Sequence, residues 1–81
     1  MPDKTQSTAA DLKSAQKGMV VKVTGDDSLR RRLNSMGIVR GAIIMADYTA
    51  PLGDPRSYMV LGYQITLRKA EAQQIVIELN Q

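Results

Sequence analysis

The sequence predicts a small, mainly β domain: a five-stranded barrel with one inserted α-helix and short helical turns. Five runs of strand length alternate apolar and polar residues, whereas one stretch alone combines helical apolar spacing with signals at both ends. The chain has 81 residues, enough for one modest core and too few for a second. A barrel follows because so short a chain has few other ways to cover its sheet edges.

The N-terminal residues are expected to add little to this barrel. Residues 1–8 are polar and hold no periodic apolar positions, which predicts a flexible tail and places the domain at residues 9–81. Residues 9–16 are expected to form one helical turn that places Leu12 inward and is capped by Gly18. The first strand, residues 19–24, alternates Val21 and Val23 with polar residues, which predicts that both valines face the core.

Residues 26–36 are predicted to form the one substantial helix. Asp26 and Asp27 can accept hydrogen bonds from the free N–H groups of a first turn, and their charges suit the positive end of the helix dipole. Gly37 follows the last apolar position, where a positive φ is often required and costs glycine nothing. The two aspartates and Gly37 are therefore expected to be structural.

One face of this helix is apolar, and the three arginines at residues 30–32 do not form a single basic face. Leu29, Leu33 and Met36 are spaced i, i+4, i+7, so they form a stripe that is expected to pack on the strands. Arg30 and Arg31 point in different directions on the helical wheel. A solvated helix surface is the favoured interpretation of these arginines, and a contact with nucleic acid or an acidic partner is the alternative.

The remaining chain supplies four more strands, expected at residues 42–48, 56–61, 63–67 and 75–79. Residues 50–55, with two prolines and a glycine, predict a turn or a projecting hairpin loop. Gly62 is expected to be a bulge or kink between two strands that pair as a hairpin. Residues 69–74 are good helix formers for about one and a half turns.

The composition argues against most catalytic and metal-binding classes. The chain has no His and no Cys, so the usual ligands of zinc, iron and copper are missing, and no disulfide framework exists. No phosphate loop, nucleophile motif or metal-binding helix motif is present. No metal, cofactor or catalytic residue is therefore predicted, and the chain is expected to be non-enzymatic. No apolar stretch is long enough to span a membrane, and no secretory leader is evident.

Several segments together resemble the FeoA family, ferrous-iron transport protein A. The resemblance rests on residues 27–41 (DSLRRRLNSMGIVRG) and 50–55 (APLGDP). It continues through Gly62-Tyr63, Leu67-Arg68 and the Glu71-Ala72 turn before Ile75, and covers about residues 12–79. Val39-Arg40 departs from the pattern, because a Thr/Leu-Pro pair is common there.

The resemblance implies an SH3-like barrel that is cytosolic and located at the inner face of the membrane through a partner. That partner would be the bacterial ferrous-iron transporter, contacted at its cytosolic GTP-binding portion. Iron homeostasis, with transition-metal binding at the level of the family, follows from the same resemblance. Self-association stays open.

Two other readings stay open. One is a stand-alone SH3-like regulatory domain related to the C-terminal domain of iron-dependent repressors, although no DNA-reading helix-turn-helix precedes it here. The other is a small nucleic-acid-binding barrel, which the scattered arginines and a supply of only three tyrosines count against.

The docking surface is predicted to include Leu52, Gly53 and Asp54 at the loop tip, together with the Arg30 and Arg31 side of the helix. Prolines at both ends stiffen the loop, so that it loses less entropy on binding than a flexible loop would. Leu52 is the one large apolar residue of that turn and is the expected anchor.

Overall fold

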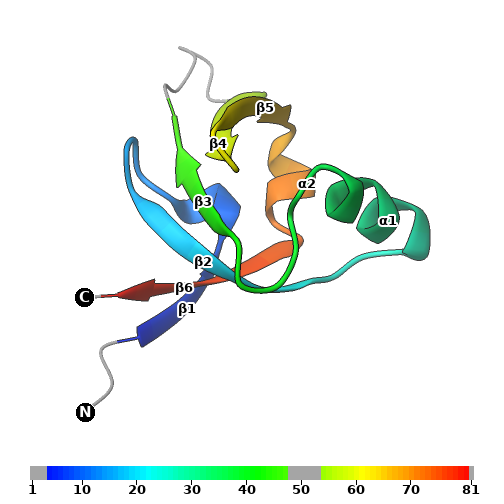
Figure 1. Cartoon of the computed structure of the whole chain (residues 1–81), viewed down its shortest axis with the longest axis horizontal. Helices are drawn as coiled ribbons and strands as arrows, with labels where there is room; N and C mark the ends of the chain where they lie inside the picture. The colour runs from blue at the N-terminus through cyan, green and yellow to red at the C-terminus, as the bar shows by residue number, and fades with distance from the viewer. Residues whose placement is uncertain (1–3, 48–53, 81) are drawn as a thin grey trace.

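An antiparallel sheet curls around a single core in the computed structural model of the chain, which describes residues 4–47 and 54–80 (Figure 1). The strands are β1 (Lys4–Thr8), β2 (Lys17–Val23), β3 (Ile43–Ala46), β4 (Arg56–Val60), β5 (Tyr63–Leu67) and β6 (Ile75–Asn80). They lie in the order β1-β6-β2-β3-β4-β5, and every neighbouring pair is antiparallel. The mainly β fold is therefore confirmed, with six strands in the described residues rather than five.

The additional strand is β1, which corrects the expectation of a flexible tail over residues 1–8. Its five residues pair with β6, for example Ser7 with Ile77 and Thr8 with Val76. This strand covers the edge of β6, so its backbone groups are used in the ladder although its side chains are polar. Hydrophobic periodicity does not detect such a strand. Residues 1–3 lie outside the described part of the chain.

The turn after β1 is tighter than predicted, a 3₁₀ helix (η1) over Ala9–Asp11. Leu12 is buried, as expected. Gly18 is not a helix cap but a β2 residue, which corrects that assignment. A Cβ at Gly18 would lie 2.6 Å from Cδ1 of Ile77, so the missing side chain allows β6 to approach closely.

The buried face of β2 also differs from the prediction. Val20 is fully buried, whereas Val21 and Val23 are half-buried. The register with β6 shifts between Val20 and Lys22, where Val20 pairs with Ile77 and Lys22 with Val76. This bulge inserts one residue, so the two-residue alternation breaks and the inward positions become Val20 and Val23.

Helix α1 (Asp27–Ser35) begins as predicted, because Oδ1 of Asp26 accepts a hydrogen bond from the Leu29 N–H at 2.8 Å. Leu33 is fully buried, and Leu29 and Met36 pack against the core at its edge. The predicted apolar stripe is therefore confirmed. Figure 1 shows α1 standing at one end of the molecule, beside α2 (Lys69–Ala72).

The end of α1 is also as predicted. Gly37 has φ of 92°, and its N–H donates to the Asn34 carbonyl. The Ile38 N–H donates to the Leu33 carbonyl, and both side chains are fully buried. This is a Schellman motif with its hydrophobic contact, and Ile38 is a core residue that lies outside every predicted helix and strand.

The hairpin of β4 and β5 is confirmed, but Gly62 is a turn residue rather than a bulge. Val60 pairs with Tyr63, so the loop consists of Leu61 and Gly62, both with positive φ.

The buried core of the described residues comprises Ala9, Leu12, Val20, Leu33, Ile38, Ile44, Ala46, Tyr58, Val60, Ile65, Leu67, Ala72, Ile75 and Ile77.

Candidate functional site

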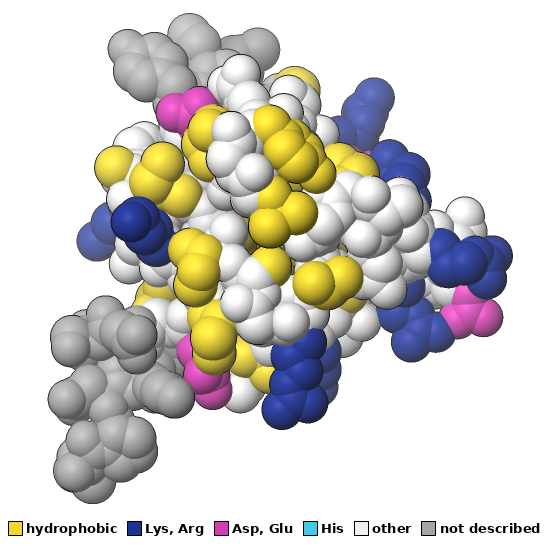
Figure 2. All heavy atoms as spheres, viewed as in Figure 1, with side chains coloured by type: hydrophobic (Ala, Val, Ile, Leu, Met, Phe, Trp, Pro, Cys, Tyr) yellow, Lys and Arg dark blue, Asp and Glu magenta, His cyan; other side chains and the backbone are white. Residues whose placement is uncertain are grey.

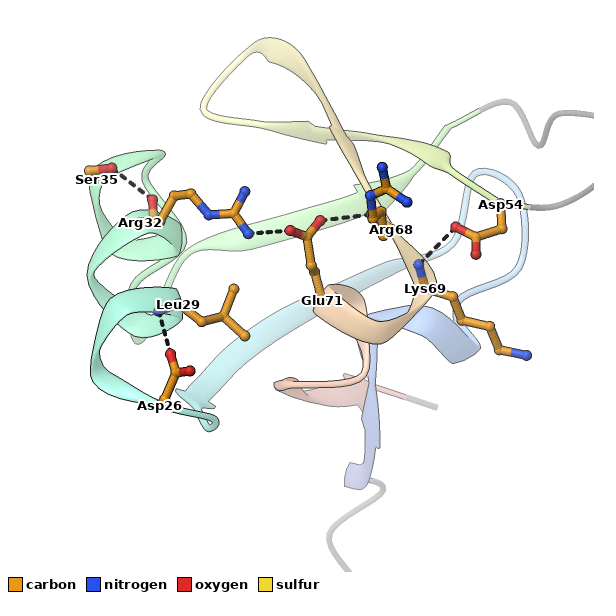
Figure 3. A network of polar contacts seen from close by, with 8 residues as sticks. All are labelled: Asp26, Leu29, Arg32, Ser35, Asp54, Arg68, Lys69 and Glu71. Atoms are coloured by element: carbon orange, nitrogen blue, oxygen red, sulfur yellow. Dashed lines mark hydrogen bonds and ion pairs between the residues drawn. The ribbon is translucent and has the colours of Figure 1, made fainter.

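The loop half of the predicted docking surface is only partly described. Leu52 and Gly53 lie outside the described residues. Asp54 is exposed, and its Oδ1 accepts a hydrogen bond from the Lys69 backbone N–H at 2.9 Å (Figure 3). The carboxylate of Asp54 thus satisfies a free donor in the first turn of α2, which ties the end of the loop to the domain.

The three consecutive arginines of α1 have three different environments. Arg30 forms an ion pair with Asp27 one turn earlier, and Arg32 forms one with Glu71 of α2. Arg31 lies on the exposed side and has no ion pair with a described residue. The two arginines predicted to act together are therefore unequal, because the charge of Arg30 is largely balanced by its neighbour.

The pair of Arg32 and Glu71 connects the two helices (Figure 3). Glu71 also accepts a hydrogen bond from the Arg68 backbone N–H at 2.8 Å. The Arg32 guanidinium, followed by the Arg68 N–H, lowers the pKa of Glu71 because both stabilise the charged carboxylate. Arg32 is thus used to hold α1 in place. No sequence pattern predicts this contact, because the two residues are 39 positions apart.

A basic groove lies between α1 and β2, with a volume of about 500 Å³. It is lined by Val21, Lys22, Val23, Asp27, Arg30, Arg31, Asn34 and Arg40. The bulge in β2 contributes to this wall, because both the inserted Val21 and Lys22 border the groove. Figure 2 shows Lys and Arg side chains gathered at the α1 end of the molecule.

The groove accounts for the net charge of the whole chain. The chain has 11 basic and 8 acidic residues, for a net charge of +3. Four of the basic residues and one acidic residue line the groove, which leaves seven of each sign elsewhere. The remaining residues therefore have a formal net charge of zero, and the excess of basic residues falls on this surface.

Three of the groove's cations have side chains without a partner in the described part of the chain. Lys22, Arg31 and Arg40 are exposed, and none of their side chains forms an ion pair or hydrogen bond within residues 4–47 and 54–80. Of the predicted docking residues, the structure thus places Arg30 and Arg31 here, and Asp54 at the start of α2 instead. Lys22, Asn34 and Arg40 were missed, since no spacing rule connects a strand, a helix and a link.

A second hollow, of about 630 Å³, lies over the other end of β2 and is lined by Ala15, Gln16, Lys17, Gly18, Met19, Ile43 and Glu78. Its lining mixes small, apolar and single charged residues, without the convergence of like charges seen in the basic groove.

Across the described ranges, no group of three or more His, Cys, Asp or Glu residues could hold a metal ion. No helix in those ranges is long and apolar enough to cross a membrane.

Comparison with known proteins gives a consistent result. A family model described as the FeoA domain matches residues 8–79. A curated relative from Porphyromonas gingivalis, named Fe(2+) transport protein A/Fe(2+) transporter FeoB fusion protein, is 34% identical over 70 residues. The match covers 86% of this chain and 8% of the relative, so the chain spans a small part of that protein's length.

Solved structures share the fold. A FeoA-like protein from Clostridium acetobutylicum has a TM-score of 0.83 and 34% identity, over 91% of this chain and 86% of that one. FeoA of Stenotrophomonas maltophilia, solved with zinc and described as an SH3 domain protein, has a TM-score of 0.76 and 27% identity, over 86% and 87% of the two chains. These likenesses confirm the predicted SH3-like fold. A manganese-dependent transcriptional repressor matches at a TM-score of 0.80 over 89% of this chain and 36% of its own, but its 17% identity establishes the fold alone.

Proposed function

The chain belongs to the FeoA domain family, and from this we propose that it is an accessory protein of bacterial ferrous-iron uptake that docks on the membrane iron transporter. The contact is made with the transporter's cytosolic GTP-binding portion, at the inner face of the membrane. The protein acts by binding, without catalysis of its own. Family membership supports the link to ferrous-iron transport, and the partner and its contacted portion are the proposal.

The fusion protein of Porphyromonas gingivalis is the observation that carries this proposal. Its name joins an Fe(2+) transport protein A and the transporter FeoB in one polypeptide. A covalent connection holds two modules at an effective concentration in the millimolar range without any binding surface. Where the two are separate chains, a surface has to supply that association instead.

The docking surface proposed here combines the α1 side, through Arg30 and Arg31, with the loop residues Leu52, Gly53 and Asp54. The cluster of exposed cations on the α1 side supports an acidic partner surface. Charge-assisted contacts of this kind accelerate association and weaken as salt is added. The stiff loop would contribute an apolar anchor through Leu52.

The test is binding of the tagged full-length chain to the full-length transporter from the same organism in lipid nanodiscs, with and without GTP. We expect saturable binding that weakens between low and physiological salt. Cross-linking followed by mass spectrometry should locate the contact on the GTP-binding portion. Leu52→Ser and Arg30→Glu/Arg31→Glu should each bind more weakly, once circular dichroism shows that they are folded.

Empty nanodiscs of the same lipids and a duplex DNA are the controls. Equal binding to empty discs would contradict a protein partner, and absence of binding at both salt concentrations would contradict the proposal itself. Tight binding to DNA without binding to the transporter would favour the regulatory domain or the nucleic-acid-binding barrel. No feature of the structure specifically favours either of these two alternatives, because the likeness to the repressor establishes the fold alone.

A further inference from the structure

We propose that the basic groove between α1 and β2 holds an acidic segment of the transporter, with Lys22, Arg31 and Arg40 as the contacting residues. This inference rests on the proposed function and identifies which residues of the α1 side do the binding. In this inference Arg30 contributes little to binding, although the sequence analysis placed it beside Arg31 in the docking surface.

The distribution of partners among the cations is the first argument. Arg30 is paired with Asp27, so recruiting it for an external carboxylate would break an existing ion pair. Lys22, Arg31 and Arg40 have no such pair among the described residues. A ligand with several negative charges gains most from these three, since nothing inside the domain has to be given up.

The shape of the surface is the second argument. The basic groove is a hollow of about 500 Å³ bordered by a helix on one side and a strand on the other. An open groove of this kind can receive projecting side chains of a partner. Two arginines and a lysine around it can bind carboxylates, the arginines by paired N–H donors, and the Asn34 amide adds a neutral donor.

The apolar part of the lining favours a protein segment over a nucleic acid or a free phosphate. Val21 and Val23 are half-buried and border the groove beside the cations. They can receive the aliphatic parts of a peptide and reduce the water around the ion pairs, which strengthens them. Among the described residues, the groove lining contains no aromatic side chain on which a nucleobase could stack.

The net charge of the groove favours the encounter with an acidic partner. The four basic residues and one acidic residue of its lining carry a net charge of +3, and the other residues have a formal net charge of zero. This charge attracts an acidic partner over about one Debye length, ~8 Å at physiological salt. Steering of this kind raises the association rate and makes it salt-dependent.

The experiment compares Arg31→Glu/Arg40→Glu with Lys13→Glu/Lys69→Glu. Both double variants change the net charge by the same amount, and all four residues are exposed, but Lys13 and Lys69 do not line the groove. Binding is measured to the transporter in nanodiscs and, separately, to an octaglutamate peptide, a tripolyphosphate and a duplex DNA. Arg30→Gln tests the minor role of the paired arginine.

The groove variant should lose about tenfold or more in affinity for both the transporter and octaglutamate, since charge reversal at two of the three contacts replaces attraction by repulsion. The control pair and Arg30→Gln should lose about threefold or less. Equal losses in both double variants would overturn the groove and leave only net charge. Tighter binding of tripolyphosphate or DNA than of octaglutamate would overturn an acidic peptide as the ligand. Wild-type binding to octaglutamate but not to the transporter would overturn the proposed function and leave the groove's preference standing.

Discussion

Gly37 shows how one residue determines where α1 ends and how the next segment enters the core. Its φ of 92° lets the chain reverse so that Ile38 becomes buried beside Leu33. A Cβ at this position would lie 2.5 Å from Cδ1 of Leu61 in the β4–β5 turn. The Tyr63 hydroxyl donates to the Met36 carbonyl at 2.5 Å, so the helix end and the hairpin are in direct contact.

We expect Gly37→Val to lower the free energy of unfolding by about 1–2 kcal/mol or more, because a side chain is strained at positive φ. Gly41→Val is the matched control, since Gly41 has φ of 90° but no atom within 4 Å of its Cβ position. Chemical denaturation of both variants separates backbone strain from crowding by Leu61. A neutral Gly37→Val variant would show that the helix end can be rearranged without cost.

Glu71 is the residue at which stability should respond to acid. Its pKa is lowered in the folded protein by Arg32 and the Arg68 N–H, so folding favours the charged form. The resulting stability is complete above the ordinary pKa of 4.5 and is lost as the pH falls through the lowered value. Glu71→Gln keeps an acceptor for the Arg68 N–H but removes the charge. Urea unfolding should show that the wild type is more stable than Glu71→Gln at pH 6 and that this difference in stability shrinks below pH ~4. A difference in stability that does not change with pH would contradict this role of Glu71.

At the scale of elements, α1 could be predicted almost completely because its signals are local. Asp26, Gly37 and the stripe centred on Leu33 each act within one or two turns. β1 could not be predicted, since a polar edge strand is held by backbone bonds to β6, some 70 positions later in the chain. The register of β2 was missed for a similar reason. Its bulge is a property of the pairing with β6 and leaves no mark in the alternation.

Leu33 should be the residue that attaches α1 to the sheet. It is fully buried, whereas Leu29 and Met36 lie at the edge of the core. Leu33→Ala should cost about 2–5 kcal/mol through lost contacts and a residual cavity. Leu33→Asp should unfold much of the population, because total stability of such a domain is ~5–15 kcal/mol. Asn34→Ala is the control, because Asn34 is exposed on the same helix. If Leu33→Asp left thermal unfolding unchanged, Leu33 would not pack in the core as described.

At the scale of the molecule, the basic groove shows what a sequence pattern cannot supply. Arg31 was recognised because it lies in a run of three arginines. Lys22 belongs to the predicted first strand, and Arg40 lies where the chain departs from the FeoA pattern. These positions meet only because the Schellman turn at Gly37 returns the chain beside β2, where the Gly41 N–H donates to the Val20 carbonyl at 2.8 Å.

Every Asp and Glu among the described residues already interacts with another group of the protein, which affects the affinity for metal ions. Each one has a partner in the protein: Asp11, Asp26, Asp27, Asp47, Asp54, Glu71 and Glu78. The sequence contains no His or Cys. A divalent ion would therefore have to displace helix caps and ion pairs to gain hard oxygen ligands alone, which are poor ligands for zinc.

Titration calorimetry of the purified chain with Zn(II), and anaerobically with Fe(II), should accordingly show no stoichiometric site of micromolar affinity or better. Competition with a chelator of known affinity calibrates the measurement, and weak binding at a fraction of one ion per chain would be consistent with carboxylates shared between two molecules. A one-to-one site in the micromolar range would contradict the prediction. In that case thermal unfolding with and without the metal would show whether the ion replaces a cap, because displacing Asp26 from the Leu29 N–H would offset part of the stabilisation that binding supplies.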